Sequence, residues 1–416
     1  MNNTIVSTEG GLGERIKSID VLRGLTILLM IFVNDLAGVN GTPWWMMHFP
    51  EGTNGMTFVD VIFPAFLFIT GMSIPFAIGK RMDKGEPKWQ IWKHILLRSF
   101  YLIVIGVFMV NTETFSDKGL IDPNLWSLLM YTGIILIWNM WSSKMKPGLV
   151  TTLRIAGIAL LLVLVFLYRG NDATGIFQMR TQWFGIIGLI GWAYLVACTV
   201  YFFFRRNPVA MTGAVAILYC VFFANFNGFF AKVGFIGNFV GIGDTLGSEG
   251  ALVLTGTILG MILTPDSPIK THWARIRWAF FYGLGLAIAG VLINSLAKIN
   301  TMFIIDKDMA TPAWCLLGAA WTVWIWIIIY LIVDVLGWKR WTAVVEPAGS
   351  NALFAYILAP MIDSIIRVFC LVTGFPNYYD ALGSTFNVGI WRSIVMAFGI
   401  TWLAGGLRYV GIRLKL

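Results

Sequence analysis

Long apolar stretches alternate with short polar segments along nearly the whole chain. A helix rises about 1.5 Å per residue, so about 20 apolar residues cross the roughly 30 Å of hydrocarbon in a membrane. Stretches of about this length begin near Val21, Phe58, Leu96, Leu125, Leu153, Trp183, Val209, Ala251, Trp278, Ala313, Asn351 and Val388. The pattern predicts an all-α fold: a polytopic transmembrane helical bundle of about 12 spans, within a range of about 10 to 12, in one domain over residues 1–416.

The composition supports a membrane environment for this chain. Hydrophobic residues make up 58% of the sequence and charged residues only 12%, against roughly 25% charged residues in ordinary soluble domains. A soluble fold cannot hide so much apolar surface. In hydrocarbon, only helices and closed barrels satisfy every backbone amide internally, and the long apolar runs favour helices.

Neither the cysteines nor the histidines predict a metal site. All four cysteines lie in apolar stretches without CxxC spacing, and we expect them to be packing residues: Cys198, Cys220, Cys315 and Cys370. The predicted topology separates the three histidines, because only His48 falls on an outer loop. We therefore expect no bound metal.

The connecting segments alternate in charge. The segment from Lys80 to Arg98 carries six cations, whereas the segment from Asn111 to Asp122 carries three carboxylates and one lysine. Cytoplasmic loops carry an excess of Lys and Arg, so the first segment is predicted to be cytoplasmic, as are both termini. The first residues lack a signal-peptide pattern, and the short tails are typical of a bacterial inner (plasma) membrane protein.

Two outer segments stand out in this topology. One is the first outer loop, from Val39 to Met56, which contains His48. The other is the stretch from Asn225 to Gly250, which is apolar but broken by glycines. Such a stretch is typical of a re-entrant or interfacial segment that lines a cavity.

The first outer loop contains candidate chemistry. Asn34 ends the first span, Asp60 opens the second, and His48 lies between them, so we expect the three side chains to meet at the outer membrane face. A neutral imidazole accepts a proton from an attacking amine or hydroxyl, and an amide orients a nucleophile or stabilises an oxyanion. Asp60 either orients His48 or caps its own helix. The alternative for His48 is a solvated interfacial residue.

The same region resembles the heparan-alpha-glucosaminide N-acetyltransferase family, in its bacterial branch. The resemblance rests on RIKSIDVLRG at residues 15–24, FVN at residues 32–34, His48, and GMTFVDVIFPAF at residues 55–66. Weaker matches are KIN at residues 298–300 with Thr311-Pro312, and GSNA at residues 349–352. The resemblance implies transfer of the acetyl group of cytosolic acetyl-CoA to a glucosamine amine across the membrane, with His48 and Asn34 as the motif histidine and asparagine.

Further candidates follow for the two substrates of such an enzyme. The cations expected to attract the phosphates of coenzyme A are Arg23, Arg98 and Lys80. For Arg23 the alternative is a structural role as the partner of Asp20. The residues expected to contact a sugar acceptor are Trp44, Trp45 and Asn300. For the two tryptophans the alternative is an interfacial anchor.

The predicted function is that of an acyl-CoA-dependent transmembrane N-acetyltransferase. His48 serves as general base or transient acetyl carrier, the periplasmic side holds an amino sugar or glycan acceptor, and acetyl-CoA is the co-substrate. A transporter or flippase for an anionic or sugar-linked solute is the alternative, with Asp363 and Arg367 on its route. We expect contact with membrane lipid and no nucleic-acid partner, with a homodimer as a candidate assembly.

Overall fold

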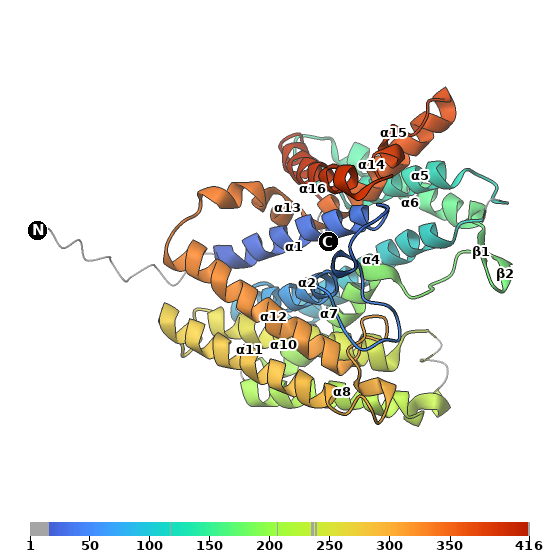
Figure 1. The fold of residues 1–416 in the computed structure, drawn as a ribbon. Coiled ribbons are helices and arrows are strands. Elements are labelled where there is room, and N and C mark those ends of the chain that lie inside the picture. Colours follow the sequence, from blue (N-terminus) through green and yellow to red (C-terminus); the bar gives the residue numbers. More distant parts are fainter. Residues whose placement is uncertain (1–15, 117, 206, 234–236, 238, 415–416) are drawn as a thin grey trace, which may run out of the picture.

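The computed structural model describes residues 16–116, 118–205, 207–233, 237 and 239–414; Arg15, the first residue of the motif above, lies outside them. The long helices are α1 (Lys17–Leu36), α2 (Val59–Ile74), α4 (Lys88–Val110), α5 (Pro123–Trp138), α6 (Pro147–Leu167), α7 (Gly185–Phe204), α8 (Pro208–Phe226), α10 (Gly250–Leu263), α11 (His272–Asn294), α12 (Pro312–Tyr330), α14 (Ala352–Thr373) and α16 (Phe386–Tyr409). They form one bundle with roughly aligned axes (Figure 1). The prediction of an all-α fold is confirmed.

Short elements connect the long helices. The short α-helices are α3 (Lys80–Asp83), α13 (Glu346–Ser350) and α15 (Tyr378–Ala381), and the strands β1 (Gly170–Asp172) and β2 (Gly175–Phe177) form an antiparallel hairpin. Single turns of tighter helix occupy Trp44–Met46, Asn111–Thr114, Phe229–Val233, Thr301–Phe303 and Arg340–Val344. Wider π-helical turns extend α2 over Pro75–Gly79, precede α10 over Ile242–Glu249, and extend α12 over Leu331–Val335.

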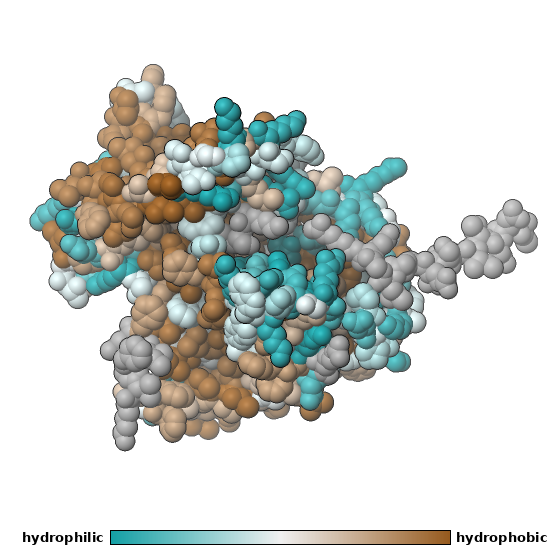
Figure 2. Space-filling view, turned by 180° about the vertical axis from the view of Figure 1, so that it is seen from behind, coloured by the Kyte–Doolittle hydropathy of each residue, from teal (hydrophilic) through white to brown (hydrophobic). Residues whose placement is uncertain are grey.

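This chain is an integral membrane protein. Within the residues that the structure describes, 10 helices are long and apolar enough to cross a membrane. α5 is apolar but shorter than these ten helices. α1 is long enough, but its charged residues set it apart from them. Together these helices match the predicted spans one for one. Brown hydrophobic residues cover large continuous areas of the face drawn in Figure 2, while hydrophilic residues gather in separate clusters.

One predicted segment boundary is wrong. The stretch Asn225–Gly250 was expected to lie outside the spans, yet helix begins at Ile242 and runs into α10 as one continuous span to Leu263, 89% of which is buried. Small residues make this possible. A Cβ atom on Gly247 would lie 2.9 Å from the backbone oxygen of Leu218 in α8, so the two helices pack at a distance that only glycine permits.

The centre of the bundle is a close contact between α2 and α10. A Cβ atom added to Gly71 in α2 would lie 1.8 Å from the backbone oxygen of Val253, and one added to Gly256 in α10 would lie 2.0 Å from that of Phe68. Gly256 and Gly260 are four residues apart and share one helix face, which is the small-xxx-small pattern of close helix pairs in membranes. α6 and α11 are peripheral, since only 17% of each span is buried.

The two ends of the described chain lie at the same end of the bundle. At the start of α1, the Lys17 ammonium contacts the carboxylate of Glu346 at 2.6 Å. Near the end of the chain, the backbone oxygen of Ile412 accepts a hydrogen bond from the Asn351 amide at 3.3 Å. The loop with His48 joins α1 to α2 at the other end of the bundle, which is called the His48 end below. That the terminal end faces the cytoplasm stays a prediction.

The glycine contact between α2 and α10 predicts a stability effect. Gly256→Ala must push the two helices apart, and overpacking of this kind costs about 1–3 kcal/mol. We expect a clear fall in the midpoint of thermal unfolding of the detergent-solubilised protein. Gly213→Ala in α8 is the control, because its Cβ atom would meet nothing within 4 Å. Equal midpoints for the two variants would contradict this role of the glycine contact.

Candidate functional site

His48 and Asp60 form a hydrogen-bonded pair at the His48 end. The imidazole Nδ1 lies 2.7 Å from the Asp60 Oδ1, and the Asp60 side chain is only 1% exposed whereas that of His48 is 47% exposed. A carboxylate only accepts, so Nδ1 carries the shared proton while the ring is neutral. The lone pair is then on Nε2, which makes no hydrogen bond with any described residue.

Backbone and indole groups hold Asp60 in place at the start of α2. Its Oδ2 accepts hydrogen bonds from the backbone N–H of Phe49 at 3.0 Å and of Thr57 at 2.9 Å. The Trp314 indole of α12 donates to the backbone oxygen of Asp60 at 3.1 Å. The Thr57 hydroxyl donates to Met47 at 2.7 Å. One carboxylate therefore fixes both the imidazole and the loop that carries it.

A second carboxylate anchors the same loop without touching His48. The Oδ2 of Asp306, in the segment before α12, accepts from the backbone N–H of Gly52 at 2.8 Å. The Asn54 side chain accepts from the backbone N–H of Ile305 at 2.9 Å. Asp306 is buried. The first outer loop is thus fastened to the loop before α12, although the two lie some 250 residues apart in sequence.

The predicted acceptor residues lie in these two loops. Trp44 and Trp45 are 72% and 51% exposed, and the Trp45 ring centroid lies 6.2 Å from that of Phe58. Asn300 uses its side-chain oxygen to accept from the backbone N–H of Met302 at 3.0 Å, which caps the turn Thr301–Phe303. The two tryptophans are available for contact, whereas the Asn300 oxygen already has a structural partner.

Asn34 does not meet His48 and Asp60 as we expected. It lines a polar cavity of about 390 Å³ between α1, α4, α5, α7, α14 and α16, and neither His48 nor Asp60 is part of that lining. On α1 the cavity residues are Ile31, Asn34, Asp35 and Gly38. A short loop predicts that the two helix ends it joins are close. The direction in which the Asn34 side chain points depends on the rotation of α1 about its axis, and the neighbouring helices set that rotation.

A second cavity lies on the other side of α1, between α1, α2 and α12. Its volume is about 400 Å³, and Thr57, whose backbone N–H is bonded to Asp60, is part of its wall. The Thr26 and Thr322 hydroxyls in this wall donate to backbone oxygens of their own helices. This cavity therefore offers a ligand apolar contacts and few free hydrogen-bonding groups.

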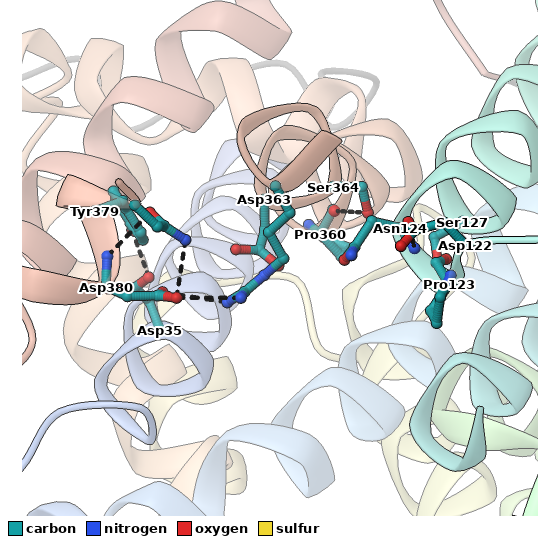
Figure 3. A network of polar contacts seen from close by, with 12 residues as sticks. Asp35, Asp122, Pro123, Asn124, Ser127, Pro360, Asp363, Ser364, Tyr379 and Asp380 are labelled. Atoms are coloured by element: carbon teal, nitrogen blue, oxygen red, sulfur yellow. Dashed lines mark hydrogen bonds and ion pairs between the residues drawn. The ribbon is translucent and has the colours of Figure 1, made fainter. Parts of the chain in front are cut away.

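A network of ion pairs lines the polar cavity, and Figure 3 draws part of it. The Asp35 carboxylate pairs with the Arg392 guanidinium at 3.1 Å and accepts from the Tyr379 hydroxyl. Arg367 bridges Asp363 at 2.9 Å and Asp380 at 3.1 Å. Burial and the bond to the Asp35 carboxylate raise the pKa of Tyr379.

Sequence reasoning found only part of this network. Asp363 and Arg367, which the sequence singled out as intramembrane charges on the alternative transport route, form an ion pair, but the pair of Asp35 and Arg392 was missed. A signal existed, because each is a charged residue within an apolar helix, and intramembrane charges of opposite sign tend to pair with one another.

The three cations predicted for coenzyme A have separate surroundings. Arg23 contacts Asp20 at 3.0 Å and the Ser73 hydroxyl at 2.6 Å. Arg98 lies over the Tyr194 ring, 5.0 Å from its centroid, and its Nε has no hydrogen-bond partner in the described part of the chain. Lys80 is exposed at the start of α3. None of the three lines either cavity, so their role stays a prediction.

Comparisons with known proteins support the sequence resemblance. Residues 15–232, more than half of the chain, match the model of the family described as a domain of unknown function, DUF5009. Heparan-alpha-glucosaminide N-acetyltransferase of Homo sapiens is 34% identical over 124 residues, 30% of this chain and 17% of the human protein. The Mus musculus protein of that name is 34% identical over 122 residues, again 17% of its length. The chain thus aligns with a small part of these relatives, and it belongs to the DUF5009 family.

Proposed function

We propose that this protein is a transmembrane acetyltransferase. It moves the acetyl group of cytosolic acetyl-CoA to an amine, or a hydroxyl, of an amino sugar or glycan on the other side of the membrane. The observation that carries the proposal is the His48–Asp60 pair, with one imidazole nitrogen held by a buried carboxylate and the other making no hydrogen bond with any described residue. The partial similarity to heparan-alpha-glucosaminide N-acetyltransferase supports it.

The chemistry assigned to His48 is a proton transfer or a two-step acetyl transfer. As a general base, Nε2 takes the proton of the attacking amine while the new C–N bond forms, the thioester C–S bond breaks, and the thiol leaves. As a carrier, Nε2 itself attacks the thioester carbon, the C–S bond breaks and coenzyme A leaves as the thiolate. The amine then attacks the acetyl carbon, the C–Nε2 bond breaks, and the proton lost by the amine protonates the thiolate. Both routes need the lone pair on Nε2. Asp60 is a positioning residue that holds the ring and stabilises the imidazolium.

The other predicted residues take supporting roles in this proposal. Asn34 holds the acceptor, because it lies on a polar cavity rather than beside the imidazole. Arg23, Arg98 and Lys80 attract the phosphates of acetyl-CoA from the terminal end of the bundle. Trp44 and Trp45 contact an acceptor that approaches the exposed loop. In this proposal His48 lies on the periplasmic side of a bacterial inner membrane, and the charge pattern of the loops supports that orientation.

The proposal predicts slow acetyl-CoA hydrolysis that depends on His48. Purified wild-type protein in detergent is expected to bind acetyl-CoA and to release free thiol, measured with a thiol-reactive dye. His48→Ala is expected to keep binding but to lose at least about 100-fold of the turnover, the usual scale of a general base. Asn34→Ala is expected to keep thioester hydrolysis and to lose acceptor-dependent transfer. Wild type that is well folded but does not bind acetyl-CoA refutes the enzyme and makes a transporter the leading alternative.

The contact between Asp60 and His48 generates a separate prediction. Asp60→Asn removes the anionic partner of Nδ1 and is expected to lower turnover by about 100-fold or more. Asp306→Asn is the matched control, because Asp306 is also buried and anchors the same loop but does not touch His48. We expect that control to lose little turnover at a temperature where both variants are folded. Equal losses would mean that Asp60 acts only by shaping the loop.

A further inference from the structure

We propose that the cavity between α1, α2 and α12 binds the hydrocarbon tail of a lipid-anchored acceptor. The inference rests on the proposed function and adds that the acceptor is a membrane-anchored molecule rather than a free sugar. The tail lies along this cavity within the membrane. The head group, which carries the amine to be acetylated, lies at the His48 end.

The wall of this cavity offers almost only apolar contacts. Its described lining contains no charged side chain, and apart from three threonines the lining residues are hydrophobic. The hydroxyls of Thr26, Thr57 and Thr322 all donate to backbone oxygens of the protein. Amide groups placed here would find few partners, which argues against the pantetheine arm of coenzyme A as the occupant. A hydrocarbon chain needs no such partners.

The cavity is long and follows the direction of the helices. α2 and α12 both begin at the His48 end, and a Cβ atom on Gly318 of α12 would lie 2.8 Å from the Pro64 ring of α2, so these two residues are at the same depth. Phe58 precedes Pro64 by six residues, Ile325 follows Gly318 by seven, and both Phe58 and Ile325 line the cavity. At the helical rise the lining therefore covers roughly 20 Å of depth. A volume of about 400 Å³ drawn out over this depth suits a chain rather than a ring.

The cavity opens sideways to the membrane. Phe58, Trp321 and Ile325 line it and are also exposed on the outside of the bundle. α1, α2 and α12 are neighbouring helices (Figure 1), and an exposed surface between membrane helices faces hydrocarbon. A tail therefore enters the cavity from the lipid without crossing water.

The outer end of the cavity meets the candidate catalytic pair. Thr57 lines the cavity, and its backbone N–H donates to the Asp60 carboxylate that holds His48. Phe58 also lines the cavity, and the exposed Trp45 ring lies 6.2 Å from the Phe58 ring between centroids. A head group on a tail in this cavity therefore lies beside the loop with His48, where Trp45 contacts it. Such an anchor raises the effective concentration of the amine at the imidazole.

Photolabelling of the full-length protein in phospholipid nanodiscs, without acetyl-CoA, tests this inference. The probe is a dodecyl glucosaminide with a diazirine at the end of its tail, and mass spectrometry identifies the labelled peptides. We expect at least about tenfold more label on the cavity-lining peptides of α1, α2 and α12 than on the peripheral helices α6 and α11. Leu25→Trp fills the cavity and is expected to lower this labelling about tenfold. Leu284→Trp, on an exposed face of α11 outside the cavity, is the matched control and is expected to label like wild type.

Acetyl transfer to acceptors with and without a tail is the second readout. Leu25→Trp is expected to lower kcat/KM for dodecyl glucosaminide about tenfold and to leave kcat/KM for glucosamine unchanged, because glucosamine has no tail to displace. The unchanged reaction with glucosamine shows that the variant is folded. Ile325→Trp fills the cavity from the opposite wall and is expected to have the same effect.

Three labelling results would overturn the assignment of the tail to this cavity. They are even labelling of all exposed membrane helices, equal labelling of the cavity by a diazirine phospholipid that lacks the amine, and loss of label when coenzyme A is added. The proposed function is judged separately by acetyl-CoA hydrolysis. Hydrolysis with even labelling would refute the tail site and leave the acetyltransferase, whereas cavity labelling without acetyl-CoA turnover would leave a lipid-tail site and refute the enzyme.

Discussion

A charged or polar side chain inside a membrane needs a partner supplied by the protein, because lipid offers none. α1 is the helix on which this constraint acts most strongly. Asp20 pairs with Arg23 near its start, and Asp35 pairs with Arg392 of α16 near its end. The Asp35–Arg392 pair and the hydrogen bond from Arg23 to the Ser73 hydroxyl of α2 tie α1 to its neighbours, and Asn34 faces the polar cavity. The position of the candidate chemistry therefore follows from how one helix satisfies its charges.

The His48–Asp60 pair holds a loop residue in one orientation. Loops of this length are mobile unless their backbone groups are bonded. Here two buried carboxylates, Asp60 and Asp306, accept backbone N–H groups from the loop, and Asp60 alone reaches the imidazole. Both carboxylates fix the loop, and only Asp60 also fixes the ring. This division makes it possible to separate a positioning role from a structural one by mutation.

The sequence predicted the helices well because the hydrophobicity and the length of a span can be read from that span alone. It also predicted that His48 and Asp60 are close, since a short loop joins α1 to α2 and the two residues are 12 apart. It failed where a tertiary contact decides. The glycine-rich turn Ile242–Glu249 looked like a loop, but glycine at a close helix contact lowers hydrophobicity without ending the helix. Asn34 was misplaced because helix rotation is set by partners from distant parts of the chain.

The packing of α1 also bears on the choice between enzyme and transporter. The polar cavity is lined by the half of α1 near the His48 end, whereas in the other half the face of α1 turned to α13 is closed by backbone contacts. A Cβ atom on Gly24 would lie 2.2 Å from the backbone oxygen of Val345, and one on Gly349 would lie 2.4 Å from that of Asp20. A transporter must open both halves in turn, and here that would require breaking the closest contact between α1 and the segment around α13. A contact this close between α1 and α13 therefore favours a fixed binding pocket over a route that opens on both sides.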